Sequence, residues 1–197
     1  MLNNESCFNL VQSSYPLGLI FYSHVTAVVS SLVLGFFVFF KDRSSAIGRN
    51  LLALSLTFAV WILCSYIDWT SSNTLNIMFI WPFFGILTIL LFIFSLQLAY
   101  VFINKKSLNF VSKLVYGFLA LPIIILTPTN LNLVGLTDVD CNAMEGKMFT
   151  NFFIFGLFIS LWILVIAIRG YRAAEESFKK QIILFGFGIE FFLISFL

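Results

Sequence analysis

Long apolar runs separated by short polar turns dominate this chain. A transmembrane helix needs about 20 mainly apolar residues. Six runs of about this length follow one another, at roughly 17–40, 51–69, 76–103, 112–128, 149–168 and 181–197, and the largest connection between them is the loop at about 129–148. The pattern predicts an all-α fold, a polytopic membrane helix bundle with six transmembrane helices.

Basic residues are divided unevenly between the two sets of loops. When the loops are assigned alternately to opposite sides of a membrane, Lys147 falls on one side, and ten of the 11 Lys and Arg residues fall on the other, namely Lys41, Arg43, Arg49, Lys105, Lys106, Lys113, Arg169, Arg172, Lys179 and Lys180. Short cytoplasmic loops are enriched in Lys and Arg. The charge pattern therefore predicts that the N-terminus and the 129–148 loop lie outside, with residues 1–16 as an extracytoplasmic leader.

The composition agrees with a membrane protein and excludes two other classes. Hydrophobic residues make up 60% of the chain and charged residues only 10%, against about 45–50% and about 25% in soluble domains. A water-soluble globule is excluded, and the lipid bilayer is the expected partner of the helices. The net charge of +2 leaves no broad basic surface for nucleic-acid phosphates, so no nucleic acid is expected as a partner.

The end of the chain carries a further expectation. With the N-terminus outside and six crossings, Leu197 is expected at the outer membrane face, directly after the apolar segment QIILFGFGIEFFLISFL. We expect such a chain to be truncated, because no exit loop follows its last span. A seventh helix would return the polypeptide to the cytoplasm.

Several features together resemble a known family. They are the short outside leader, the Pro-containing segment LALPIIILTPTNLN, the longer outside loop after it, and the basic turn RGYRAAEESFKKQIILFGFGIE that leads into a glycine-containing helix. In these features the chain resembles the N-terminal seven-helix membrane region of bacterial sensor histidine kinases and of related diguanylate cyclases, truncated after the sixth helix. It departs from the family after the fourth helix, where Leu131 and Asn132 stand in place of a histidine.

The resemblance implies a function and partners. Residues 17–197 are then a sensory or anchoring domain in the inner cell membrane of a bacterium, which passes a signal to a cytoplasmic output domain outside this chain. Sensor kinases of this kind work as dimers, so a homodimer is implied as well.

Four polar side chains in or beside the predicted spans are candidates for a ligand or sensing role, because ionisable and polar groups are costly in a membrane. They are His24, Asp68, Gln97 and Glu190. A histidine changes charge between about pH 5 and 8, which suits His24 to proton sensing; the alternative is a histidine hydrogen-bonded to a neighbouring helix. Glu190 is expected near mid-bilayer and buried against other helices, either in a functional role or in an interhelix hydrogen bond. Asp68, next to an aromatic pair, favours anchoring at the interface.

The three cysteines have no metal-ligand spacing with the single histidine, so no metal site is predicted. The topology places Cys7 and Cys141 on the outer side, where thiols oxidise to disulfides that persist. A Cys7–Cys141 bridge would hold the leader over the 129–148 loop; the alternative is two free thiols. Cys64 lies within the second span.

The sequence carries no catalytic motif. It has no HExxH, no GxSxG and no glycine-rich phosphate loop, so we expect no enzyme activity and no cofactor. A small-molecule transporter or channel component is the alternative to a sensor, since Pro82, Pro122 and Glu190 would suit one. A transporter or channel would need more polar side chains within the membrane than Ser95, Gln97, His24 and Glu190 provide.

Overall fold

The computed structural model describes residues 17–71, 74–136 and 143–196. Of these residues, 83% are helical. They form six helices, namely α2 (Leu17–Lys41), α3 (Ala46–Thr70), α4 (Thr74–Asn104), α5 (Phe110–Leu126), α6 (Phe149–Ala173) and α7 (Glu176–Ile194). Unbroken apolar sequence explains their length. At the start of α5, the Asn109 side chain accepts a 2.9 Å hydrogen bond from the Ser112 amide and so caps the helix.

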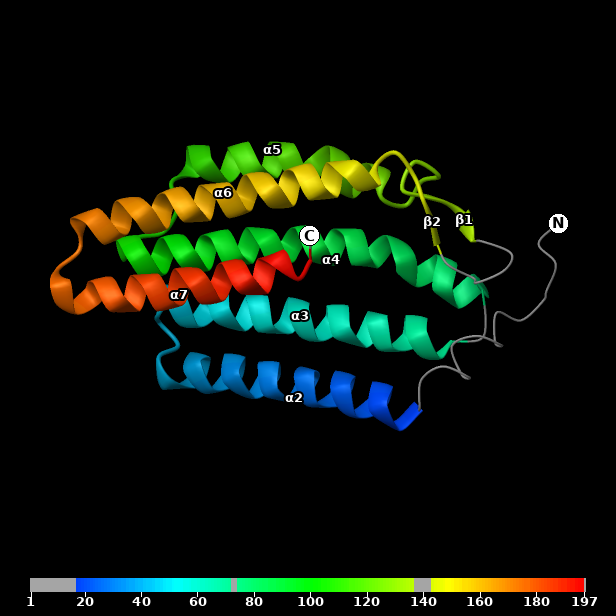
Figure 1. Cartoon of the computed structure of the whole chain (residues 1–197), viewed down its shortest axis with the longest axis horizontal. Helices are drawn as coiled ribbons and strands as arrows, with labels where there is room; N and C mark the ends of the chain where they lie inside the picture. Colours follow the sequence, from blue (N-terminus) through cyan, green and yellow to red (C-terminus); the bar gives the residue numbers. More distant parts are fainter. Residues whose placement is uncertain (1–16, 72–73, 137–142, 197) are drawn as a thin grey trace.

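The helices lie side by side along one direction and alternate in sense (Figure 1). The α2–α3, α4–α5 and α6–α7 connections gather at one end of the bundle, on the left of the figure. The last turn of α3, the first turn of α4, the end of α5 and the start of α6 lie towards the other end. Consecutive helices thus run in opposite directions, as a chain that crosses a layer repeatedly requires.

Helix α4 is the centre of the bundle, and it contacts α3, α5, α6 and α7. Its side chains fill the interior: Ile89, Leu91 and Leu96 are at most 1% exposed. From α6, Ile159 and Ile163 complete this core, and neither has any exposed surface. Helix α2 lies at the periphery, where it packs on α3.

Four helices, α2, α3, α4 and α6, are long and apolar enough to cross a membrane. The expectation of six spans is thus met by length and apolarity for four of the six helices. Helix α5 has only 17 residues, and α7 contains several charged residues, most of them in its first two turns. The observed helices also extend past the predicted spans: α3 begins at Ala46 and α6 ends at Ala173, because helical structure continues into the basic turns.

A small hairpin lies within the segment expected to be a loop at 129–148. Strand β1 (Leu133–Leu136) pairs antiparallel with β2 (Ala143–Glu145), with Leu133 opposite Glu145 and an irregularity before Gly135. The hairpin lies at the end of the bundle opposite the three clustered turns (Figure 1).

Candidate functional site

The four candidate residues do not form one site. His24 and Asp68 belong to the α2–α3 pair, Gln97 lies between α4 and α5, and Glu190 lies between α6 and α7. The polar groups are thus distributed over three separate helix pairs. The arrangement excludes a shared site built from all four.

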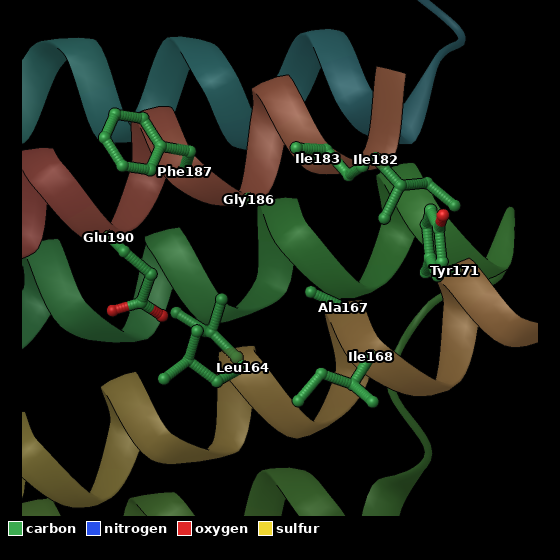
Figure 2. Close-up of a pocket in the computed structure, with 10 residues that line it drawn as sticks. Leu164, Ala167, Ile168, Tyr171, Ile182, Ile183, Gly186, Phe187 and Glu190 are labelled. Atoms are coloured by element: carbon green, nitrogen blue, oxygen red, sulfur yellow. The ribbon is translucent and has the colours of Figure 1, made fainter. Parts of the chain in front are cut away.

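Glu190 lies at one end of a groove between α6 and α7. Its side chain is 9% exposed, which agrees with the expected burial of this residue against another helix. Figure 2 shows the carboxyl pointing from α7 towards α6, beside Leu164. On α6 it faces the middle of the helix, because Ile163 and Leu164 line the same groove.

The groove has a volume of about 300 Å³ and is otherwise apolar. Small side chains form part of its floor: a Cβ added to Gly186 would lie 3.5 Å from Ala167 Cβ, so the two helices approach closely there. Tyr171 lies at the end of the groove away from Glu190 (Figure 2). The complete lining is Ile163, Leu164, Ala167, Ile168, Tyr171, Ile182, Ile183, Gly186, Phe187 and Glu190.

The carboxyl of Glu190 is not fully satisfied. Ser160 on α6 lies close enough to influence it, but no hydrogen bond of acceptable geometry joins them. Both Glu190 Oε1 and Ser160 Oγ are buried without a hydrogen-bond partner. Buried polar groups in native proteins are normally paired, and an unpaired one calls for an explanation. The Ser160 hydroxyl is therefore the polar neighbour that α6 offers to Glu190, within reach of the interhelix hydrogen bond expected there, and both atoms are covered by the packed helices.

His24 is held between two helices by both ring nitrogens. Nδ1 lies 2.8 Å from the Ile20 carbonyl oxygen on the same helix, and Nε2 lies 3.4 Å from Ser65 Oγ on α3. A carbonyl oxygen only accepts, so Nδ1 donates to Ile20, and Nε2 shares a hydrogen bond with the Ser65 hydroxyl. The ring also contacts Tyr66, with 5.9 Å between centroids. His24 thus lies in contact with both helices of the α2–α3 pair, as the alternative of a histidine hydrogen-bonded to a neighbouring helix requires.

Asp68 and Gln97 lie at different positions in the bundle. Asp68 is half-buried on α3, one helical turn after Cys64. Gln97 Nε2 donates a 2.7 Å hydrogen bond to Tyr116 Oη, which joins α4 to α5. Tyr116 is 7% exposed, so this bond is shielded from the surroundings of the bundle.

A second notable feature is the end of the bundle that holds the three clustered turns, here called the basic end. Ten Lys and Arg residues, all of those in the chain except Lys147, lie in these turns or in the adjoining helix ends. Only three acidic residues accompany them, namely Asp42, Glu175 and Glu176. Asp42 is part of the α2–α3 turn, where Oδ1 accepts from Ser44 Oγ at 2.7 Å and from two backbone amides. The Ser44 hydroxyl lowers the pKa of this carboxyl below its ordinary value.

Aromatic side chains also bind a cation at the basic end. Lys105 Nζ lies 4.9 Å from the Phe102 ring centroid and 4.4 Å from that of Phe178. Phe102 stacks in turn on Phe185, with centroids 4.1 Å apart. The end of α4 is thus joined to the first half of α7.

The cysteine pairing expected between Cys7 and Cys141 lies outside the described residues. Cys64 has a free thiol. Within residues 17–71, 74–136 and 143–196, no group of three or more His, Cys, Asp or Glu side chains is placed to hold a metal ion.

Ser160, Tyr116 and Tyr171 could not be selected from the sequence, because a serine or tyrosine in an apolar helix is common. The one usable signal was spacing: Gly186 and Glu190 are four positions apart and share a helix face.

Comparison of the chain with protein-family models, with curated proteins and with solved structures finds no match.

Proposed function

We propose that this protein is a membrane-embedded sensory or anchoring module that crosses the bilayer six times, with its N-terminus outside and its basic end in the cytoplasm. The observation that carries the proposal is the gathering of ten of the 11 basic residues at one end of the bundle. Enrichment of Lys and Arg in short cytoplasmic loops is the strongest general determinant of orientation.

The two remaining helices fit this placement. Helix α5 has 17 residues and is about 26 Å long at 1.5 Å per residue, close to the thickness of the hydrocarbon core. In α7 the charged residues Glu176, Lys179 and Lys180 all lie at the basic end, and the segment after them is apolar apart from Glu190. In this placement the charged residues at the start of α7 lie at the membrane interface. The apolar parts of α5 and α7 lie within the bilayer.

The closely packed apolar interior favours a sensor or anchor over a transporter. The centre of the bundle consists of closely packed apolar side chains such as Leu91, Phe92 and Ile159, each at most 1% exposed. A transport path needs polar groups along its length. Among the described residues the buried polar side chains are few, and most are serines or threonines within single helices.

The route of a signal follows from the packing of α7. This helix contacts both α4 and α6, and the Lys105–Phe178 contact links it to the α4–α5 turn. A ligand that shifts α7 against α6 would change the arrangement of the basic end. We propose that a cytoplasmic output partner, in the same polypeptide or in a separate one, responds to that change.

Orientation is tested by cysteine accessibility. In a variant whose three native cysteines are replaced by serine, single cysteines are placed at Ser44, Ser107 and Thr129. In intact cells, a membrane-impermeant maleimide should label position 129 only, and permeabilised cells should show labelling at all three. Labelling of position 44 or 107 in intact cells would contradict the proposed orientation.

Function is tested in proteoliposomes and in cells. The purified protein should give no flux of protons, metal cations or small amines above that of empty liposomes. A photo-crosslinking amino acid at Ser107 or Ser177, both at the basic end, should capture a cytoplasmic signalling protein or domain. Saturable flux that depends on the protein would instead support the transporter alternative.

A further inference from the structure

We propose that the groove between α6 and α7 binds a compact lipophilic amine, with the ammonium group on the Glu190 carboxylate and the apolar body along the groove towards Tyr171. The inference names a ligand class for the proposed sensory module and rests on that proposal for the placement of the groove in the bilayer. The observation behind it is a buried carboxyl at one end of an otherwise apolar groove whose lining contains no basic residue.

The size of the groove limits the ligand. A volume of about 300 Å³ is at the lower end of the range for small-molecule pockets. It equals the volume of about ten water molecules in the liquid. From the level of Ile163 to that of Tyr171 the groove is ~12 Å long, at 1.5 Å per residue of α6. These dimensions suit a slender molecule of about ten non-hydrogen atoms and exclude a whole helix, which is about 10 Å across.

The chemistry of the lining selects an amine head. None of the lining residues is basic, and Glu190 is the one acidic residue among them. A carboxylate or phosphate head would meet a like charge or compete for the same proton. A neutral amine that enters from the bilayer takes the proton of a neutral Glu190 carboxyl, so that R–NH₂ and R′–COOH become R–NH₃⁺ and R′–COO⁻. The transfer leaves the groove with no net charge, because the ammonium pairs with the carboxylate that it has formed.

The position of the carboxyl argues against a phospholipid as the occupant. Glu190 faces the middle of α6, far from both ends of the bundle. A phospholipid places its polar head at the interface and its acyl chains at the midplane, which would bring a hydrocarbon chain against the carboxyl. A compact amine brings a polar group to that depth with little apolar surface.

Binding is measured with the full chain in lipid nanodiscs, using radiolabelled 4-phenylbutylamine and the matched alcohol 4-phenylbutanol. Partition of each probe into lipid is the same for every variant, so differences between variants report the site. The amine should bind saturably, and the alcohol at least tenfold more weakly. Glu190→Gln should weaken amine binding at least tenfold, because the amide keeps the shape but cannot take the charge.

Two further pairs of variants separate the groove from general effects. Gly186→Leu fills the floor of the groove and should abolish saturable binding, whereas Gly188→Leu, whose added Cβ has no atom within 4 Å, should leave it unchanged. Asp68→Asn, an acid-to-amide change on α3, should also bind normally. If Gly186→Leu does not fold, the Glu190→Gln variant and the comparison of amine with alcohol still test the proposal.

Equal binding of amine and alcohol would overturn the proposal, as would unchanged binding by Glu190→Gln. Cross-linking of two copies through Leu164 and Phe187 in the absence of probe would also overturn it, since a second copy would then cover the groove. Failure of the membrane topology appears in cysteine accessibility, which does not depend on the probes. The two proposals therefore fail separately.

Discussion

Gln97 on α4 donates a 2.7 Å hydrogen bond to the hydroxyl of Tyr116 on α5. The two residues are 19 positions apart, on either side of the α4–α5 turn, and Tyr116 is one of the few buried residues of α5. Most of the remaining surface of α5 is exposed, as at Phe118 and Leu121. The bond is therefore a main determinant of the position of this helix against α4.

The first prediction concerns this bond. Tyr116→Phe leaves the Gln97 amide without its acceptor, which costs about 1–3 kcal/mol in a protein interior, although interhelix hydrogen bonds in bilayers average about 0.6 kcal/mol. We expect a loss of about 1 kcal/mol in the free energy of unfolding, measured by denaturation in mixed micelles. Tyr22→Phe removes an exposed hydroxyl and serves as the control. Equal stability of Tyr116→Phe and the parent would contradict the assigned role.

The second prediction concerns the close approach of α2 and α3. A Cβ added to Gly35 would lie 2.7 Å from Ser55 Cβ, a separation that real side chains do not adopt. Gly35→Ala should therefore push α2 away from α3 and destabilise the protein by about 1–3 kcal/mol, the usual cost of overpacking. Gly18→Ala on the same helix meets open space and should be neutral or slightly stabilising. Thermal unfolding of both variants checks the difference, and equal midpoints would contradict it.

The helices and the gathering of basic residues at one end of the bundle could be predicted from sequence, because both follow from the apolar and charged pattern of the chain. Apolar length sets the spans, and the cost of charge in hydrocarbon confines Lys and Arg to the turns. The same cost predicted the burial of Glu190. The exact ends of the helices could not be predicted as well, because polar residues such as Arg49 and Arg169 continue a helix that is already formed.

The hairpin and the groove could not be predicted for a different reason. The segments Leu133–Leu136 and Ala143–Glu145 are too short to show an alternating pattern. The groove depends on how α6 packs on α7, where Gly186 meets Ala167, and apolar helices with similar sequences pack in many ways. Tertiary contacts decide both features, as they decide that Gln97 meets Tyr116.

The third prediction concerns pH and the α2–α3 turn. Hydrogen bonds from Ser44 and Ser45 lower the pKa of Asp42 in the folded protein. A lowered folded pKa means that the carboxylate stabilises the fold above the unfolded value of about 3.9 and that this contribution is lost as pH falls through the lower folded value. We expect the parent to unfold at a higher temperature than Asp42→Asn at pH 6.

The difference between the parent and Asp42→Asn should shrink as pH falls below about 4. Ser44→Ala, which removes the main cause of the shift, should show the same pH dependence with a smaller difference from Asp42→Asn. A gap that widens on acidification would show that the sign of the Asp42 contribution is wrong. Thermal unfolding between pH 3 and pH 7 measures all three proteins.

The last prediction separates two opposing effects at Lys105. This residue has a φ of 56°, a left-handed conformation that costs a side-chain-bearing residue about 1–2 kcal/mol, and its ammonium contacts the rings of Phe102 and Phe178. Each cation–π contact at an exposed site is worth about 0.5–1 kcal/mol. Lys105→Met keeps the backbone strain and loses the cation, so it should destabilise by about 1 kcal/mol. Lys105→Gly loses both and should be close to neutral. A double-mutant cycle with Phe178→Leu should give a coupling of about 0.5–1 kcal/mol to Lys105→Met; a coupling near zero would mean that the aromatic contact does not join α4 to α7.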